Sequence, residues 1–287
     1  MAIKVPSGKK TLTGAPINPL PGDVPYTTVS LCPECGAQVE ARVLEQDGRI
    51  VMEKTCPEHG FFRDTLLAHA DYFHRMVSWN RDVGCGVSNP AIPDAKSCPD
   101  DCGMCNLHVS HTVLANVDLT NRCNLACPIC FANASVQDYI YEPSFEQIVD
   151  TLQTLRDSRP VAGRVVQFAG GEPTLHPDWF RILAKAGEMG FSHVQCATNG
   201  LKFAEDSFAE KSREAGLHTL YLQFDGVNPE LYEKIRGRRD LLDIKMKAIE
   251  KVRQAGLKIV YVPTIVKGVN DDQVPKIVQF ALDTIDV

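Results

Sequence analysis

Residues 121–131 read NRCNLACPICF and place Cys123, Cys127 and Cys130 in the spacing C-x3-C-x2-C. The stretch directly follows residues 112–119, TVLANVDL, whose apolar and β-branched residues predict a buried strand. Thiolates are the usual ligands of iron–sulfur clusters, so three cysteines in this spacing can hold three corners of a [4Fe–4S] cubane. Such a cluster leaves one iron open to a further ligand, which makes this stretch a candidate catalytic centre.

Downstream of the cysteines, β-type runs alternate with helical patterns. Strands are expected at residues 112–119, 164–169, 193–197, 219–224 and 258–262, and helices at 144–156, 178–189, 240–254 and about 272–283. Ser144 and Gln147 form a capping box at the first helix, and Gly256 is a C-cap for the third. The alternation predicts right-handed βαβ crossovers and a parallel sheet. We therefore expect an α/β fold, a partial (β/α)6 barrel that stops after five βα units, with residues 283–287 approaching another strand.

Polar or glycine-containing segments follow each predicted strand. In parallel βα folds the functional site forms at the carboxyl ends of the strands. Besides the cysteines, the segments at these ends are Gly170-Gly171-Glu172-Pro173, Thr198-Asn199-Gly200, Gln223-Phe224-Asp225-Gly226 and Pro263-Thr264. We expect all five ends to converge on one face.

The spacing C-x3-C-x2-C occurs a second time, at Cys98, Cys102 and Cys105. No strand precedes this copy, so we assign the catalytic role to the triplet at Cys123. With Cys85 the earlier triplet has four thiolates, enough for a complete auxiliary [4Fe–4S] cluster that would carry electrons or anchor substrate. Without Cys85, His108 or His111 is the alternative fourth ligand, or the position stays open for substrate. A second zinc site is the remaining interpretation.

Two further ligand pairs lie nearer the N-terminus, in Cys32-Pro-Glu-Cys35 and Cys56-Pro-Glu-His59. The residues between them predict a hairpin that turns at Asp47-Gly48. This pattern is typical of a zinc ribbon or rubredoxin-like site, in which a metal stabilises a β unit with little core of its own. Zinc is the expected metal and iron the alternative. Cys85 is the alternative fourth ligand if His59 lies at the surface.

Composition sets the remaining limits on the chain of 287 residues, which is 44% hydrophobic and has a net charge of −6. The number of cysteines, eleven, is odd, and no export signal is seen. Metal binding is therefore favoured over a disulfide framework as the role of these cysteines. We expect an extended lead-in (1–30), a cysteine-rich metal-binding region (31–110) and a core barrel (111–287). A cytoplasmic location without nucleic-acid partners is expected. Cys196, inside a predicted strand, is expected to be a buried apolar residue.

The cysteines at 123–130 followed by aromatic Phe131 resemble the signature of the radical S-adenosylmethionine (SAM) superfamily. The resemblance implies that SAM chelates the open iron and is cleaved reductively to a 5′-deoxyadenosyl radical. It further implies that Gly170, Gly171 and Glu172 receive the amino group of SAM. It also implies that Thr198 and Asn199 contact the carboxylate or ribose of SAM and that Gln223 contacts the ribose. The backbone around Phe131 would contact the adenine. The resemblance supports SAM contacts by Asp225 and Thr264 more weakly.

The chain resembles one group within that superfamily over about residues 31–270. The resemblance lies in the order of three features, a cysteine-rich domain, then CPxDCGxC, then NRCNLxCPxCF. This group contains archaeal tetraether lipid synthase and methanopterin-type methylases; its members carry a cysteine where this chain has Val113. The resemblance implies a transferase or oxidoreductase for carbon–carbon bond formation or methylation on a lipid or pterin-like substrate. Implied partners are SAM, the substrate, a ferredoxin or flavodoxin reductant and, for a lipid, the membrane surface. A peptide-modifying maturase and a non-catalytic iron–sulfur or zinc electron carrier or adaptor are the alternatives.

Overall fold

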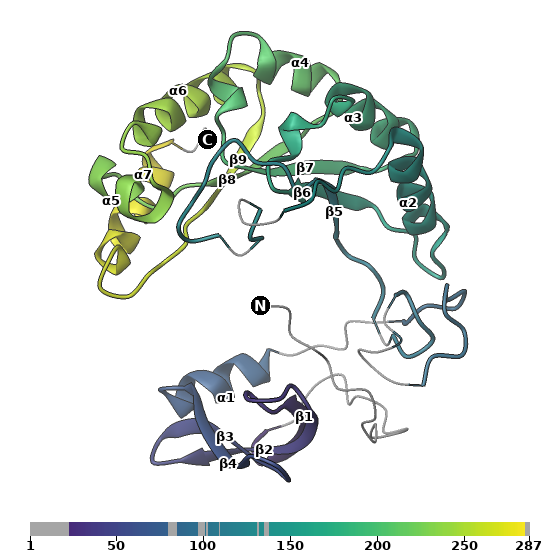
Figure 1. The fold of residues 1–287 in the computed structure, drawn as a ribbon, viewed down its shortest axis with the longest axis vertical. Helices are drawn as coiled ribbons and strands as arrows, with labels where there is room; N and C mark the ends of the chain where they lie inside the picture. Colours follow the sequence, from purple (N-terminus) through teal and green to yellow (C-terminus); the bar gives the residue numbers. More distant parts are fainter. Residues whose placement is uncertain are drawn as a thin grey trace. The chain divides into compact units, whose positions relative to one another are not determined.

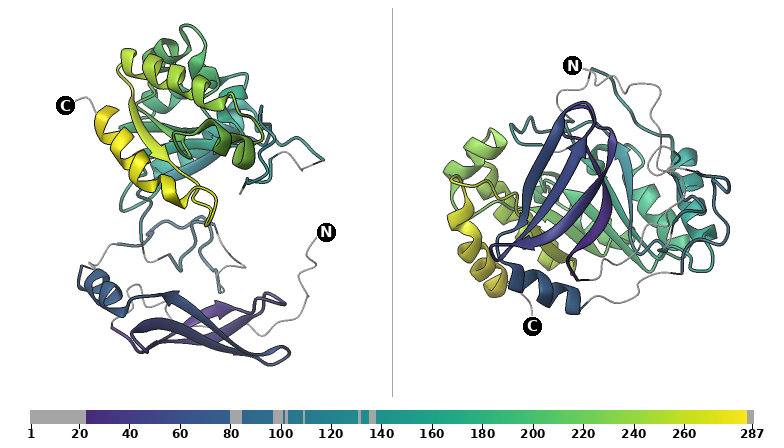
Figure 2. Two further views of the ribbon diagram at one scale, coloured as in Figure 1. Left: turned by 90° about the vertical axis from the view of Figure 1, so that its left-hand side faces the viewer. Right: turned by 90° about the horizontal axis from the view of Figure 1, so that it is seen from below.

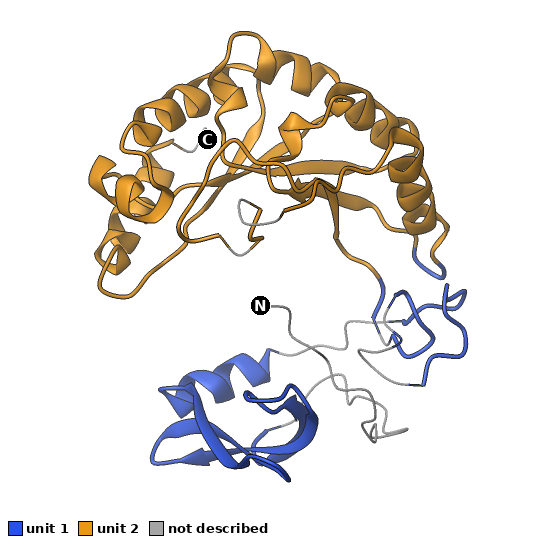
Figure 3. Ribbon diagram, in the orientation of Figure 1, with its two compact units in different colours: residues 1–111, 159–161 blue, residues 112–158, 162–287 orange. Residues whose placement is uncertain are grey.

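The computed structural model describes residues 23–79, 85–96, 101, 103–108, 110–130, 132–134 and 138–284. Cys98, Cys102 and Phe131 lie outside the described residues. The chain divides into two compact units, described separately below: unit 1 is residues 1–111 with 159–161, and unit 2 is residues 112–158 with 162–287 (Figure 3).

Within its described residues, unit 1 contains an antiparallel sheet and a helix (Figure 2). Its strands are β1 (Tyr26–Leu31), β2 (Gln38–Gln46), β3 (Arg49–Cys56) and β4 (Gly60–Leu67), in that order, and its helix is α1 (Ala70–Ser78). The turn between β2 and β3 is Asp47-Gly48, as predicted, and both residues have positive φ, 51° and 69°. Asp and Gly tolerate that conformation, which matches the twist of a two-residue hairpin. Because β1 begins at Tyr26, the sheet extends into the stretch expected to be an extended lead-in.

The apolar core of unit 1 is small and falls into two groups. Cys32, Val39 and Cys56 form one, and Val43, Ile50 and Ala70 form the other. Two of the six residues in these groups are candidate metal ligands. A sheet with so few buried apolar side chains gains little from the hydrophobic effect, so a bound metal is the expected additional source of stability.

Unit 2 is a parallel α/β sheet with helices along its convex side, the predicted fold class (Figure 1). Its strands follow chain order, β5 (Ala115–Thr120), β6 (Val165–Gly170), β7 (His193–Thr198), β8 (Thr219–Gln223) and β9 (Lys258–Val262). The helices are α2 (Phe145–Asp157), α3 (Trp179–Glu188), α4 (Phe208–Glu214), α5 (Pro229–Arg236), α6 (Leu241–Gln254) and α7 (Val274–Thr284), with short 3-10 turns at Pro173–Leu175, Lys202–Ala204 and Asp271–Gln273. None of the helices within the described ranges combines the length and apolar character needed to span a bilayer.

The sequence patterns account for most of these elements. The predicted capping box at α2 is present, with Ser144 accepting from the Gln147 main chain and the Gln147 side chain accepting from the Ser144 main chain. The C-cap of α6 is Ala255, and the predicted Gly256 follows it with φ of 71°, the left-handed conformation that commonly ends a helix. Helices α4 and α5 are additions that the apolar pattern did not predict. Each is short, and α5 is set by Asn228 at its N-cap and Gly237 at its C-cap.

One continuous core joins the sheet of unit 2 to its helices. Phe168 on β6, Leu220 on β8 and Leu183 on α3 are fully buried in it. Cys196 is also fully buried there, in agreement with its expected apolar role. This core fixes the strands, so the loops at their carboxyl ends rest on a rigid base.

We expect Phe168→Ala to lower the free energy of unfolding of unit 2 by about 3–5 kcal/mol, because a fully buried aromatic side chain leaves a cavity. Its ring lies edge-on to Trp179 with centroids 6.3 Å apart, so urea unfolding can be followed by tryptophan fluorescence. Phe180→Ala is the control: Phe180 is 37% exposed and should cost less. Equal costs for the two variants would contradict this description of the core.

Candidate active site

The carboxyl ends of the five parallel strands carry the segments singled out in the sequence. The last strand residues are Thr120, Gly170, Thr198, Gln223 and Val262. Residues 121–130, here termed the cysteine loop, follow the first of these ends. Since parallel strands of one sheet end at the same edge, the predicted site residues of unit 2 lie along that edge.

Gly170 and Gly171 bring the end of β6 against the cysteine loop. Gly171 N donates to Thr120 O, and Glu172 N donates to Arg122 O, both at 2.8 Å. A Cβ at Gly170 would lie 2.2 Å from Thr120 O, and one at Gly171 would lie 2.4 Å from Arg122 O. The φ of Gly170, 125°, is also one that other residues rarely adopt. Two glycines are therefore required here by close approach of the backbone.

The Glu172 carboxylate points into the protein and is only 1% exposed. Its Oε1 accepts from Thr174 Oγ1 at 2.6 Å and from Thr198 Oγ1 at 2.8 Å. Its Oε2 accepts from the main-chain nitrogen of Asn199 at 2.8 Å. Burial raises the pKa of Glu172, and these hydrogen bonds oppose the shift. The carboxylate thus fixes the turn after β7, while its predicted contact with the amino group of SAM stays a prediction.

Asn199 connects that turn to the cysteine loop. Its Nδ2 donates to Asn124 Oδ1 at 2.7 Å and lies 4.0 Å from Cys123 Sγ. Its Oδ1 accepts from Leu201 N at 3.0 Å, which holds the side chain in this orientation. Asn199, one of the predicted SAM contacts, therefore lies beside Cys123.

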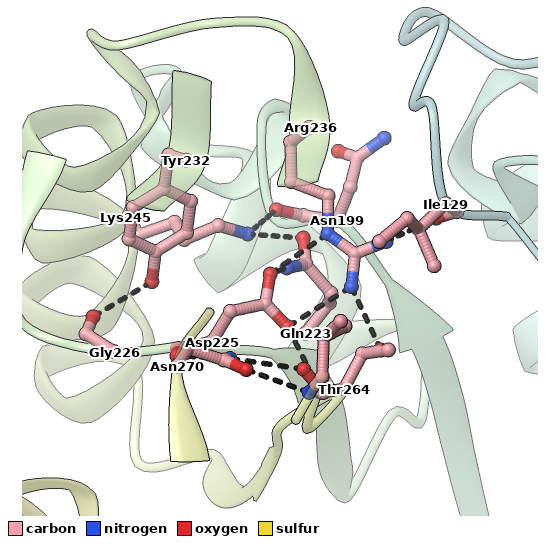
Figure 4. A network of polar contacts seen from close by, with 11 residues as sticks. Ile129, Asn199, Gln223, Asp225, Gly226, Tyr232, Arg236, Lys245, Thr264 and Asn270 are labelled. Carbon is pink, nitrogen blue, oxygen red and sulfur yellow. Dashed lines mark hydrogen bonds and ion pairs between the residues drawn. The ribbon is translucent and has the colours of Figure 1, made fainter. Parts of the chain in front are cut away.

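A second polar network crosses the ends of β8 and β9 (Figure 4). Asp225, which is fully buried, forms a bidentate ion pair with Arg236, at 2.7 Å to Nε and 2.9 Å to Nη2. Thr264 contributes twice: its main-chain nitrogen donates to Asp225 at 2.9 Å, and its hydroxyl accepts from Arg236 at 2.8 Å. Asn270 Nδ2 donates to the main-chain oxygens of Asp225 and Thr264. Asp225 and Thr264 thus lie in contact, and both form hydrogen bonds to other residues of the chain.

Lys245 on α6 is fully buried next to this network. Its Nζ donates to Asn199 O at 2.7 Å and to Gln223 Oε1 at 3.0 Å, and it lies 5.8 Å from the centre of the Tyr232 ring. Gln223 donates in turn to Asp225. Burial lowers the pKa of Lys245 to about 7, and Asp225 opposes the shift. Lys245 joins the end of β8 to the turn after β7.

In unit 1, the predicted N-terminal ligands come together. Cys32, Cys35, Cys56 and His59 place their ligand atoms within 4.8 Å of one another. His59 Nδ1 lies 3.8 Å from Cys32 Sγ and 3.6 Å from Cys56 Sγ, and it lowers the pKa of Cys56 to about 6. A tetrahedral zinc ion with bonds of about 2.0–2.3 Å has ligands about 3.3–3.8 Å apart, so these four donors fit one metal ion.

The residues expected for the auxiliary cluster are described only in part. Cys85 Sγ lies 3.6 Å from His111 Nδ1, and Cys105 Sγ lies 3.9 Å from His108 Nδ1. Both histidines considered as fourth ligands therefore lie beside a cysteine of the predicted set. The auxiliary cluster itself stays a prediction.

Comparison with known families assigns both units. A family model described as the radical SAM superfamily matches residues 117–281, more than half of the chain. The chain belongs to the radical SAM superfamily. A second model, described as the HMPTM N-terminal zinc ribbon domain, matches residues 24–67, so the radical SAM core is preceded by a zinc ribbon.

Individual relatives share the radical SAM core. The chain is 46% identical over 261 residues to a protein named 7,8-dihydro-6-hydroxymethylpterin dimethyltransferase from Methanocaldococcus jannaschii, a match that covers 91% of this chain and 51% of the relative. It is 26% identical over 172 residues to a GTP 3′,8-cyclase from Staphylococcus carnosus, covering 58% of this chain and 50% of the relative. The chain thus spans about half the length of the curated relatives it matches.

Solved structures show the same fold. SuiB from Streptococcus suis bound to S-adenosylmethionine has a TM-score of 0.51 at 20% identity, covering 61% of this chain and 39% of that chain. Methylornithine synthase has a TM-score of 0.50 at 18% identity, covering 61% of this chain and 51% of that chain. At these identities the likeness concerns the fold alone.

The cysteine loop of this radical SAM core fits a cluster better than a single ion. Burial raises the pKa of Cys123, and the charges of Glu172, Cys127 and Cys130 add to the shift. In the part of the chain that the structure describes, however, the donors found within 4.8 Å of one another are those of the zinc ribbon, not the three thiols of the cysteine loop. One zinc ion needs thiolates about 3.8 Å apart. A cluster distributes its thiolates over several iron atoms and so accommodates the wider spacing.

Sequence reasoning missed Arg236 and Lys245. Lys245 had a detectable signal, because it lies four residues after Leu241 and three before Ala248, on the apolar face of the predicted helix. A lysine on that face has to find polar partners inside the protein. Arg236 lies in α5, which was not predicted, and nothing in its neighbourhood in the sequence marks it as buried.

Gly171→Ala should destabilise the cysteine loop, because its Cβ would meet main-chain oxygens at 2.4 and 2.7 Å. We expect unfolding free energy to fall by about 1–3 kcal/mol and iron per reconstituted chain to fall with it. Gly187→Ala in α3 is the matched control, since nothing lies within 4 Å of its Cβ, and it should be neutral or stabilising. Full iron loading of Gly171→Ala would show that the close approach is not required.

His59→Ala should weaken zinc binding by unit 1 by at least about tenfold, because one ligand of the tetrahedral site is lost. Zinc affinity is measured by competition with a chromophoric chelator. Cys85→Ala is the comparison, and it should leave this affinity unchanged. The opposite pattern would make Cys85 the fourth ligand, the alternative left open by the sequence.

Proposed function

We propose that this chain holds a [4Fe–4S] cluster on Cys123, Cys127 and Cys130, cleaves SAM there and methylates a pterin-like substrate. The radical would remove a hydrogen atom from the substrate, a second SAM molecule would supply the methyl group, and the external reductant would supply the electrons. The observation that carries the proposal is the cysteine loop, which lies at the carboxyl edge of a parallel sheet in a member of the radical SAM superfamily. When bound, the cluster would supply the electron that breaks a carbon–sulfur bond of SAM and yields a 5′-deoxyadenosyl radical.

For SAM itself, we propose contacts with Asn199 and the backbone of Gly170 and Gly171. Asn199 is supported by its position 4.0 Å from Cys123 Sγ, and the glycines by their contact with the same loop. Thr198 donates to Glu172, and Gln223 and Asp225 are engaged with Lys245 and Arg236.

We therefore propose that Thr198, Gln223, Asp225 and Thr264 act mainly by holding the edge in shape. Their direct contacts with SAM stay predictions. So does the adenine contact around Phe131, which lies outside the described residues.

Methylation of a pterin-like substrate is the version that the relatives support. The relative at 46% identity is named for dimethylation of a dihydropterin and matches over 91% of this chain. Carbon–carbon bond formation on a lipid finds no support in the relatives described above, and contact with a membrane surface was expected only for that version. The likeness to SuiB is one of fold and lends no weight to peptide modification.

We further propose that the cluster is reduced by a ferredoxin or flavodoxin. The auxiliary [4Fe–4S] cluster on Cys98, Cys102, Cys105 and Cys85 would lie on that electron path or anchor substrate, and the zinc ribbon would have a structural role. The non-catalytic alternative, an electron carrier or adaptor, accounts for the metal sites of unit 1. It does not explain why the segments GGE, TNG and QFDG follow successive strand ends.

The proposal is tested with anaerobically reconstituted, reduced chain, SAM and 7,8-dihydro-6-hydroxymethylpterin. We expect 5′-deoxyadenosine and a methylated pterin, both detected by mass spectrometry. Cys127→Ala should reduce both to background. Cys196→Ala, which removes a thiol from the core of the same unit, should retain both.

Each possible failure identifies the part that is wrong. A fully iron-loaded chain that forms no 5′-deoxyadenosine would refute SAM cleavage. Formation of 5′-deoxyadenosine without any methylated pterin would refute the substrate while leaving the radical chemistry standing.

A further inference from the structure

Arg236 connects the Asp225 network to the cysteine loop. Its side chain is only 7% exposed, and its Nη1 donates to the main-chain oxygen of Ile129 at 2.7 Å (Figure 4). Ile129 lies between Cys127 and Cys130, so this bond fixes the main chain between two cysteines. Burial raises the pKa of the Cys127 thiol, and the positive charge of Arg236 opposes that shift.

The helix that carries Arg236 lies against the same loop. A Cβ at Gly237, the next residue, would be 3.7 Å from Pro128 Cδ and 3.8 Å from Ala126 O. Tyr232, one turn earlier, is packed with Leu125, and Cys123 and Cys127 contact that group. The loop is therefore held by α5 through apolar contact as well as through the guanidinium.

We propose that Arg236 is a positioning residue for the iron–sulfur cluster: it clamps the cysteine loop and keeps a positive charge beside Cys127, with Asp225 fixing its orientation. The inference rests on the proposed function, because it requires a cluster on these three cysteines. It adds a residue outside the signature motifs that sets how firmly the cluster is held and how readily it is reduced.

The geometry explains why an arginine stands here. A guanidinium has five donors in a rigid fork, so two can hold the Asp225 carboxylate while others reach Ile129 O and Thr264 Oγ1. Asp225 is itself fixed by the main chain of Thr264. A lysine provides the charge but not the fork, and so could not make all of these contacts together.

The arrangement also has an electrostatic consequence. The reduction potential of an iron–sulfur cluster depends on nearby charge, on hydrogen bonds to its sulfurs and on solvent exposure. Reduction adds negative charge, so the positive charge of Arg236 favours the reduced state and the negative charge of Asp225 opposes it. Removing either charge should therefore shift the potential, and the two shifts should have opposite signs.

The test uses the full chain, reconstituted anaerobically, without substrate. Iron per chain, the rate of iron loss to a chelator and the midpoint potential of the cluster are measured, the last by EPR of the signal that changes when SAM is added. We expect Arg236→Gln to lower the midpoint potential and to lose iron roughly tenfold faster, the factor for one charged hydrogen bond. Asp225→Asn should raise the potential. Arg238→Gln is the matched control, because Arg238 is exposed and pairs with Asp240, and it should behave as wild type.

Unchanged potential and iron loss in Arg236→Gln would overturn the inference, and so would shifts of the same sign in Arg236→Gln and Asp225→Asn. If Arg236→Gln does not fold, Arg236→Lys replaces it, with faster iron loss expected at near wild-type potential; iron retention equal to wild type would refute the clamp. A separate measurement tests the proposed function. If the triple variant Cys123→Ala/Cys127→Ala/Cys130→Ala binds as much iron as wild type, these cysteines do not hold a cluster and the proposed function is refuted.

Discussion

Close approach of residues 170–172 to the cysteine loop constrains everything else at the carboxyl edge. A side chain at either glycine would push the loop away from β6, because its Cβ would overlap main-chain oxygens of Thr120 or Arg122. With the backbones in contact, Glu172 is directed into the protein and holds the turn that carries Asn199. Asn199 then reaches back to Asn124 in the loop. The contacts thus run from the cysteine loop through Glu172 and Asn199 and back to the cysteine loop.

The two units reach stability in different ways. Unit 2 has a continuous apolar core that fixes five strands before any cofactor binds. In unit 1 the buried groups are small, and two of the buried side chains, Cys32 and Cys56, belong to the metal site. We therefore expect metal binding and folding to be coupled in unit 1, and we expect unit 2 to fold before a cluster is assembled on it.

The sequence was most informative about backbone elements and least informative about polar partners. Alternating apolar runs were sufficient to locate β5–β9, and the rule that parallel strands end at one edge placed the site segments. Helix α5 was missed, although Asn228-Pro229 and Gly237 are typical start and stop signals. The partners of Gln223 and Asp225 could not be predicted, since a polar side chain after a strand has the same sequence pattern whether it binds a ligand or a buried arginine. That choice depends on the tertiary position of α5 and α6.

One feature of the Arg236 network concerns the curvature of the sheet. β5 and β9 are the two outermost strands and share no ladder hydrogen bonds. The contacts from Ile129 through Arg236 and Asp225 to Thr264 nevertheless join the loop after β5 to the end of β9. These contacts form a direct connection between the two edges of the curved sheet. The position of the segment between Cys127 and Cys130 is therefore linked, through these contacts, to the opposite edge of the sheet.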